Sequence, residues 1–316
     1  MRKVAFYTLK VAVAGGLLYW LFHRGDIGED VLSRAAAGPW DIGMVLVLQG
    51  AILVLSIVRL RWLLGAVGVS ATLGDTARYT FIGLFIALLG PGAAVGDTVK
   101  TVYLARGSSR KTETVLAVVV DRLMGFMGLV LLAFAGLLFN LPLFLAGRFR
   151  PVMYAVGVAA GVCGVILLFL LIRPGRRVVP GEKGWFARFR EAVDLYRNRP
   201  GTLGMCLLIS LAVHVMVVIS FLFLGRALGE ASVGFGKAAT LVPVGLALNS
   251  LGPFGGIGVG EAAFKTIYKL AGSTLGGDVC FLYHVLFLIW GLAGMVVFLV
   301  TPMPAGTLKE AGQRQP

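Results

Sequence analysis

Long apolar segments, almost free of charged residues, recur along this chain of 316 residues. An α-helix rises about 1.5 Å per residue, so about 20 residues cross a hydrocarbon core roughly 30 Å thick. Six segments have this length and character, at about residues 4–22, 42–60, 115–139, 151–172, 203–224 and 279–300. The pattern predicts an all-α integral membrane protein with about six full transmembrane helices.

The first apolar segment follows Arg2 and Lys3, as the apolar core of a secretory signal peptide would. Its apolar run is long for such a peptide, and the segments after it are themselves predicted membrane spans. We therefore expect it to be retained as the first transmembrane helix.

Two further apolar segments are interrupted. Residues 76–106 are broken by the sequence GPG at 90–92, and residues 238–272 by the sequence GPFGG at 252–256. The arm before the first break would be only about 22 Å long as a helix, which is too short to cross the bilayer. We expect each segment to form a re-entrant, broken helical hairpin.

The two interrupted segments resemble each other after a shift of 162 positions. The shift superimposes Gly74, Ala77, Gly83, Leu84, Leu89, Gly90 and Pro91 on Gly236, Ala239, Gly245, Leu246, Leu251, Gly252 and Pro253. After short insertions, the Gly-acid pair at 96–97 falls on 260–261, and the Lys-Thr-x-Tyr motif at 100–103 falls on 265–268. These matches predict an internal repeat.

The predicted topology makes this repeat an inverted one. Six spans and two re-entrant hairpins place both termini in the cytoplasm, with the first hairpin entering from inside and the second from outside. Secondary transporters share this architecture and bind their substrates where paired broken helices meet near the midplane. We expect a single membrane domain over residues 1–300, with halves at about 40–140 and 203–300, and a cytoplasmic tail at 301–316.

Charge is distributed unevenly, with 29 Lys and Arg against 15 Asp and Glu and a formal net charge of +14. Basic residues crowd into the loop at 173–200, whereas the loop between the first two spans is mainly acidic. This asymmetry is the positive-inside signature of a membrane protein and not a nucleic-acid footprint. The basic loop also carries apolar residues at helical spacing, namely Trp185, Phe186, Phe189, Val193 and Tyr196. They predict an amphipathic helix on the cytoplasmic leaflet.

Composition excludes a soluble catalytic domain. Hydrophobic residues make up 58% of the chain and charged residues 14%, against about 25% charged residues in soluble domains. The sequence contains no HExxH or GxSxG motif and no metal-binding Cys/His spacing. We therefore expect no enzyme activity, no cofactor and no metal ion, and we interpret Cys163, Cys206 and Cys280 as small buried side chains.

Charged residues within or beside membrane-depth segments are the candidates for function. They are Asp97, Lys100, Asp121, Arg122, Glu261 and Lys265. Each would cost about 2.5 to 3.5 kcal/mol unpaired at mid-bilayer, so they must pair or line a wet cavity. We expect the cations to receive a phosphate and the acids to hold them or titrate, assisted by helix N-termini near Gly96 and Gly260. The alternative is that acid and base only neutralise each other and fix the hairpins.

Arg59, Arg61 and Trp62 end the second span on its inner side. Interfacial snorkelling is their default interpretation, and capture of a substrate at the interface is the alternative. His214 and His284 lie within spans, where a histidine either relays protons or bonds to a neighbouring helix.

Several of these motifs occur together in a known family. They are Arg61-Trp62, the GPG sequence followed by Gly96-Asp97 with a basic residue three positions later, Asp121-Arg122 opening a span, and GGIG at 255–258 followed by Glu261. In this order and spacing, over about residues 4–300, the chain resembles the lysylphosphatidylglycerol synthase transmembrane-region family. Relatives often carry Arg at the position of Lys100 and Pro-x-Pro at 252–254. An Arg-to-Lys difference loses bidentate phosphate geometry and could accompany a different headgroup.

The resemblance implies a stand-alone flippase of a prokaryotic cytoplasmic membrane, because no aminoacyltransferase domain follows Thr301. Its substrates would be membrane lipids with phosphate headgroups: an anionic or aminoacylated phospholipid, or a polyprenyl phosphate. A secondary transporter of a small soluble anion is the main alternative. An intramembrane lipid-modifying enzyme and a purely structural membrane protein are further ones, and a homo-oligomer is compatible with tandem glycines such as Gly15-Gly16.

Overall fold

The computed structural model describes residues 29–90, 93–145, 147–171, 193–230, 232–252 and 254–301. Every regular element in these ranges is a helix, which confirms the predicted all-α fold. In chain order they are α2 (Glu29–Ala36), α3 (Pro39–Ala66), α4 (Leu73–Leu89), α5 (Ala93–Arg106), α6 (Lys111–Phe139), α7 (Leu141–Leu145), η1 (Gly147–Phe149), α8 (Arg150–Leu171), α10 (Pro200–Ala227), α11 (Phe235–Asn249), η2 (Phe254–Gly256), α12 (Val259–Leu270) and α13 (Gly276–Val300).

Four helices in the described ranges, α3, α6, α10 and α13, are long and apolar enough to cross a membrane. They contain four of the predicted spans. The apolar helix α8, with 22 residues, covers the predicted span at 151–172 to within one residue. The predicted span at 4–22 lies outside the described residues.

Local sequence signals fix where several helices begin. Pro39 and Pro200 stand in the first turns of α3 and α10, where a missing N–H costs nothing. The first hairpin begins with a side-chain cap, because the Thr72 hydroxyl accepts a hydrogen bond from the Asp75 N–H at 3.0 Å. The predicted breaks lie between helices, the first between α4 and α5 and the second between α11 and α12.

Both interrupted segments form helical hairpins, with α4 packed along α5 and α11 along α12. In the first hairpin the two backbones approach so closely that a Cβ on Gly96 would collide with the carbonyl oxygen of Gly83. In the second, the ring of Phe264 in α12 lies over Gly245 in α11. Gly83 and Gly245 are matched positions of the repeat, so each allows the close approach of the following arm.

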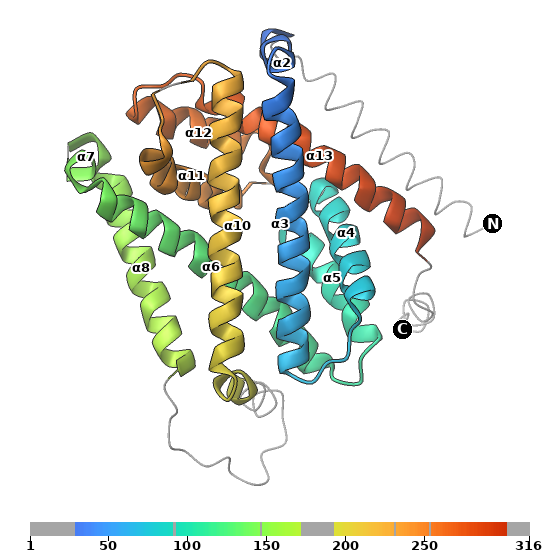
Figure 1. The fold of residues 1–316 in the computed structure, drawn as a ribbon. Coiled ribbons are helices and arrows are strands. Elements are labelled where there is room, and N and C mark those ends of the chain that lie inside the picture. Colours follow the sequence, from blue (N-terminus) through green and yellow to red (C-terminus); the bar gives the residue numbers. More distant parts are fainter. Residues whose placement is uncertain are drawn as a thin grey trace, which may run out of the picture.

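The two hairpins are inserted from opposite ends of the molecule (Figure 1). Helices α3 and α10 lie antiparallel and side by side, with α4–α5 beside the end of α3 and α11–α12 beside the end of α10. Each hairpin packs on a long helix of the other half, α4 on α13 and α11 on α6. Gly294 of α13 approaches the backbone at Phe81, and Gly136 of α6 approaches the backbone at Thr240. The described helices thus form two inverted and interlocked halves.

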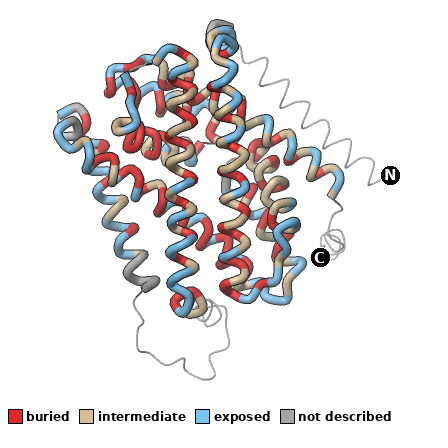
Figure 2. Tube along the Cα trace, in the orientation of Figure 1, coloured by how far each residue is buried: buried red, intermediate tan, exposed pale blue. Residues whose placement is uncertain are grey.

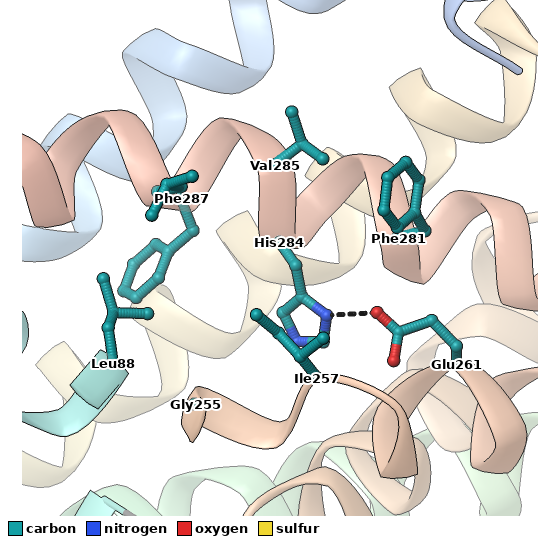
Figure 3. Close-up of a pocket in the computed structure, with 9 residues that line it drawn as sticks. Leu88, Gly255, Ile257, Glu261, Phe281, His284, Val285 and Phe287 are labelled. Carbon is teal, nitrogen blue, oxygen red and sulfur yellow. Dashed lines mark hydrogen bonds and ion pairs between the residues drawn. The ribbon is translucent and has the colours of Figure 1, made fainter. Parts of the chain in front are cut away.

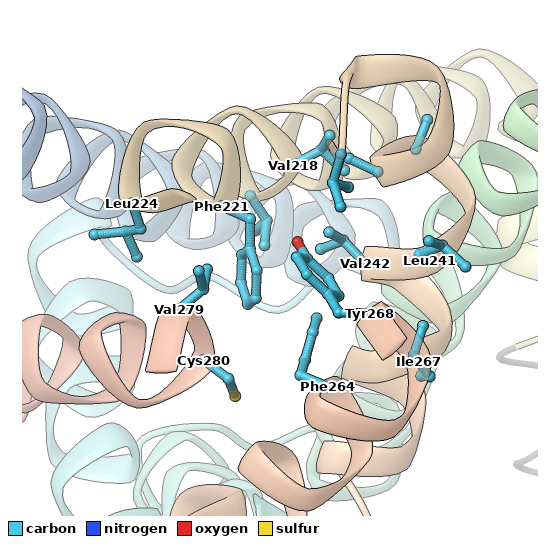
Figure 4. Packing of buried hydrophobic residues seen from close by; sticks show 14 of the residues in the cluster. Val218, Phe221, Leu224, Leu241, Val242, Phe264, Ile267, Tyr268, Val279 and Cys280 are labelled. Carbon is cyan, nitrogen blue, oxygen red and sulfur yellow. The ribbon is translucent and has the colours of Figure 1, made fainter. Parts of the chain in front are cut away.

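Buried residues lie mainly on the inner faces of the long helices and hairpins, and exposed residues mainly on the outward faces (Figure 2). Around the second hairpin, Phe221 of α10 stacks on Phe264 at a centroid distance of 4.6 Å, and Tyr268 meets Phe264 edge-on (Figure 4). Lipid tails are as apolar as these rings, so close packing and dispersion hold the helices together here.

The outward faces of the spans are apolar. Large aliphatic side chains are more than half exposed on each of the four long helices: Val47 and Val54 on α3, Val119 and Leu138 on α6, Leu208 on α10, and Val296 and Val300 on α13. In water such faces would be unfavourable, whereas against acyl chains they cost nothing. The distribution supports a membrane as the surrounding solvent.

The basic linker is described only from residue 193 onward, and its earlier aromatic residues lie outside the described ranges. Val193 and Tyr196 are buried inside the protein, in a cluster with residues of α3 and α6. The Tyr196 hydroxyl donates a hydrogen bond to the Leu63 carbonyl at 2.9 Å, and burial raises the pKa of this phenol. Val193 and Tyr196, two of the five apolar residues of the predicted amphipathic helix, thus face the protein and anchor the linker to the end of α3.

Candidate functional site

The first hairpin carries a cluster of three charges. Asp97 of α5 forms an ion pair with Lys100 Nζ at 3.0 Å and a second ion pair with Arg122 of α6. Asp97 and Lys100 lie three residues apart on one helix face, and Arg122 reaches them from the neighbouring helix. One carboxylate therefore holds two cations, and the cluster has a net charge of +1.

The two cations of this cluster differ in exposure. Lys100 has a side-chain exposure of 8%, whereas Arg122 has 57%, although it lies in a helix apolar enough to span the membrane. A guanidinium has five N–H donors in a fixed fork, and one carboxylate leaves some of them available. Arg122 therefore keeps donors available for an oxyanion on its exposed side.

The second hairpin carries an acid paired with an imidazole. Glu261 Oε1 lies 2.7 Å from His284 Nδ1 of α13, and Glu261 Oε2 accepts the Gly258 N–H at the start of α12. The carboxylate thus caps its own helix and links that helix to α13. The partner of Glu261 is an imidazole, whereas the partners of Asp97 are an ammonium and a guanidinium group.

These two pairs occupy equivalent places in the inverted halves. Asp97 matches Glu261 in the sequence repeat, and His284 lies 162 positions after Arg122, the shift that the repeat has before its short insertions. In each half the acid comes from the second arm of the hairpin and its partner from the long helix that follows. Both halves therefore have an acid–base contact at this place, with a guanidinium as the base in the first half and an imidazole in the second.

A small, mostly apolar pocket lies where the tip of the first hairpin meets the second (Figure 3). Leu88, at the end of α4, approaches Gly255 in the loop before α12. Glu261 and His284 supply polar groups to the pocket wall, and Phe281 and neighbouring residues of α13 supply apolar ones. The hairpin tips thus meet between the two halves, as the predicted inverted architecture requires.

A known protein family matches almost the whole chain. The model of the lysylphosphatidylglycerol synthase transmembrane region matches residues 7–294. The chain belongs to this family. No curated protein and no solved structure matches the chain. Membership confirms the resemblance found in the sequence and supports a multi-pass membrane protein.

In this family member, the six charged candidates do not form one cluster. Asp121 pairs with Arg59 at 2.8 Å, and Arg59 also donates to the Ser210 hydroxyl at 2.8 Å, within a buried cluster between α3, α6 and α10. Lys265 is exposed on α12 and makes no ion pair within the described ranges. The structure thus brings together Asp97, Lys100 and Arg122 and separates the others from them.

The three residues proposed for interfacial capture also lie in different environments. Arg59 is 7% exposed and points into the protein, so it cannot capture a substrate at the interface. Arg61 is half-buried and Trp62 is exposed near the end of α3, where both remain interfacial candidates. Gly96 and Gly260 serve a packing role, since a Cβ on either would collide with the opposite arm of its own hairpin.

Two features of this family member could not be read from single motifs. His284 lies 23 residues beyond Glu261 on another helix, so its pairing with that acid follows only once the repeat is extended to the final span. Cys280, one helical turn before His284, comes within reach of both. His214, considered as a relay, instead contacts the Gly125 carbonyl at 2.8 Å, which is the interhelical role of an intramembrane histidine.

Proposed function

We propose that the protein moves a lipid with a phosphate-bearing headgroup between the two leaflets of a prokaryotic cytoplasmic membrane. Its family takes its name from the synthase of an aminoacylated phospholipid. The substrate would be an anionic or aminoacylated phospholipid or a polyprenyl phosphate. The basic loop at 173–200 would face the cytoplasm together with both termini.

The observation that carries this proposal is the exposure of Arg122, within a spanning helix, in the cluster with Asp97 and Lys100. A soluble anion would be expected to bind within an enclosed lumen. A lipid headgroup instead enters laterally while its acyl chains stay in the bilayer, so its phosphate meets a cation on the flank of the bundle. The 57% exposure of Arg122 within a spanning helix fits the lateral route.

The cluster would lower the electrostatic cost of moving a phosphate through the membrane. A bare phosphate that enters hydrocarbon loses hydration worth far more than a protein's net stability unless charged groups replace the water. Arg122 and Lys100 would bind the phosphate while Asp97 keeps them in position and limits the net charge. The start of α5, close to Asp97, adds the positive end of a helix dipole.

The hairpins supply a route for alternating exposure. Their tips meet between the two halves, and each hairpin packs on a long helix of the other half. A shift of one hairpin relative to its supporting helix would open the cluster toward one leaflet, as in transporters built from inverted repeats. Coupling to a proton gradient through Asp97 or Glu261 is part of this proposal. Transport that is indifferent to an imposed pH gradient would remove that part and leave downhill exchange.

Leaflet exchange in proteoliposomes tests the proposal. Headgroup-labelled phosphatidylglycerol, lysyl-phosphatidylglycerol and a polyprenyl phosphate are compared for wild type, Lys100→Ala and Arg122→Ala, with Lys265→Ala as the control of equal charge change. We expect exchange of one lipid, abolished by the first two substitutions and retained by the third. No exchange of any lipid by folded protein, together with uptake of inorganic phosphate into the same vesicles, would favour a soluble-anion transporter. Turnover of a labelled lipid in detergent would instead indicate an enzyme.

A further inference from the structure

The contact between the second hairpin and α13 contains three metal-ligating side chains. The donor atoms of Glu261, Cys280 and His284 lie within 4.8 Å of one another. Cys280 and His284 are four residues apart on α13, so they share one helix face, and Cys280 Sγ lies 3.9 Å from His284 Nδ1. Glu261 approaches the same ring nitrogen from α12 at 2.7 Å.

Comparison with the first half shows what the second half lacks. There the equivalent carboxylate, Asp97, is held by Lys100 and Arg122, which are both permanent cations. In the second half Glu261 has only His284 as an ion-pair partner in the described ranges, and the lysine one turn along α12, Lys265, does not pair with it. The second site therefore has less positive charge than its counterpart, and a bound cation would restore the balance.

The donor set suits a particular class of cation. A thiolate, an imidazole and a carboxylate are the ligands of Zn²⁺ and of its substitute Co²⁺, at about 2.0 to 2.3 Å, which places tetrahedral ligands about 3.3 to 3.8 Å apart. The Cys–His separation of 3.9 Å is close to that value. The Glu–His contact of 2.7 Å is a hydrogen bond that would open by less than about 1 Å to admit the ion.

Charge and surroundings also agree with a divalent ion. Binding would release the thiol proton of Cys280 to solvent and leave the neutral His284 ring protonated on Nε2, so that Nδ1 can bind the ion. One thiolate, one carboxylate and one divalent cation then sum to zero charge. A neutral complex costs least in a membrane interior. Both Glu261 and His284 line the pocket between the hairpin tips, and the buried side-chain oxygen of the neighbouring Asn249 has no hydrogen-bond partner in the described ranges.

We propose that Glu261, Cys280 and His284 form a binding site for Zn²⁺ or a similar divalent transition-metal ion, with a fourth position open toward the pocket between the hairpin tips. The ion would fasten α12 to α13 and so hold the second hairpin to its own half. This inference does not rest on lipid transport, and its tests do not measure transport.

Metal binding by the purified full-length protein tests the site. After treatment with a chelator, the protein is dialysed against Zn²⁺ and its metal content is measured by mass spectrometry. A parallel sample receives Co²⁺, whose bond to a thiolate produces strong near-ultraviolet absorption. We expect one Zn²⁺ per chain and the thiolate band for wild type and for the control Cys163→Ser, which alters another buried cysteine. Cys280→Ser should abolish the band and His284→Gln should lower the metal content at least tenfold.

Thermal unfolding in detergent gives the second measurement and checks folding. Zn²⁺ should raise the melting temperature of wild type and Cys163→Ser and leave that of Cys280→Ser and Glu261→Gln unchanged. If a variant is unfolded without metal, the Zn²⁺ content of the wild-type protein still tests the proposal. Less than 0.1 Zn²⁺ per folded wild-type chain, or equal Zn²⁺ content in wild type and a folded Cys280→Ser/His284→Gln double variant, would overturn the proposal.

Discussion

The two halves of this protein share a framework and differ in the chemistry mounted on it. Each half has a long helix, a hairpin broken near its tip and a second long helix, and in each an acid of the hairpin contacts a base of the following helix. In the first half that base is Arg122, supported by Lys100. In the second half the base is His284. Lys100 stands three residues after Asp97, whereas Phe264 stands three residues after Glu261.

The two halves also differ at the position directly before Arg122 and His284 on the long helices. Asp121 pairs with Arg59 between α3 and α6. At positions 162 residues later, Tyr283 and Phe221 meet as an aromatic pair at a centroid distance of 5.0 Å between α10 and α13. The same helix crossing is therefore held by a buried ion pair in one half and by ring packing in the other. A repeat conserves the geometry of its contacts more strictly than their polarity.

Removing one partner of the buried ion pair should have the largest effect. Arg59→Met leaves Asp121 unpaired and buried, so we expect the free energy of unfolding to fall by about 3 to 5 kcal/mol. Unfolding by SDS in mixed micelles measures it. The double variant Arg59→Met/Asp121→Leu imitates the apolar crossing of the second half and should recover most of the loss. A double variant as unstable as the single one would show that this crossing requires charge.

Neutralising the acid of each hairpin should destabilise the protein more in the first half than in the second. Asp97→Asn leaves Lys100 and Arg122 close together without their shared anion, and because Arg122 is partly exposed we expect a loss of about 2 to 3 kcal/mol. Glu261→Gln weakens one hydrogen bond to an imidazole and leaves no pair of close cations, so the loss should be about 1 kcal/mol. Both are measured by the same SDS titration without added metal. Equal losses would contradict the assignment of permanent cations to one half only.

The matched glycines offer a smaller contrast. In the first hairpin a Cβ on Gly83 would press against the backbone at Gly96, and we expect Gly83→Ala to cost about 1 to 3 kcal/mol. In the second, a Cβ on Gly245 would meet the ring of Phe264, so Gly245→Ala should be rescued by Phe264→Leu. Melting temperatures of the three variants test this. A Gly245→Ala/Phe264→Leu protein no more stable than Gly245→Ala alone would show that backbone contact limits both hairpins.

The smallest effect is expected at Lys265. The sequence repeat aligns it with Lys100, but it is exposed and forms no ion pair within the described residues. Lys265→Ala should therefore change the free energy of unfolding by less than about 0.5 kcal/mol, whereas Lys100→Ala should cost more because Lys100 is buried against Asp97. A large loss at Lys265 would restore the predicted equivalence of the two lysines.

Much of this architecture could be predicted from the sequence because membrane spans depend on local composition. The spans within the described residues and both hairpins follow from the length of apolar runs and from the breaks at 90–92 and 252–256. The partners of the charges could not be predicted. Asp121 and Arg122 are neighbours in sequence, yet on a helix they point about 100° apart, one toward Arg59 and the other toward Asp97. Packing between helices decides such contacts, and periodicity within one helix does not encode it.

Each hairpin packs on a long helix of the other half, and this has a consequence for the synthesis of the protein. Helix α4 rests on α13, which contains some of the last described residues to leave the ribosome. The first hairpin must therefore wait in the membrane, with its α13-facing side against lipid or another protein, while nearly two hundred further residues are made. Its early partners are its own arms, closed over Gly83 and Gly96, together with α3 and α6 of its own half. The tight glycine contact of this hairpin thus gives it a structure of its own during the interval before the second half arrives.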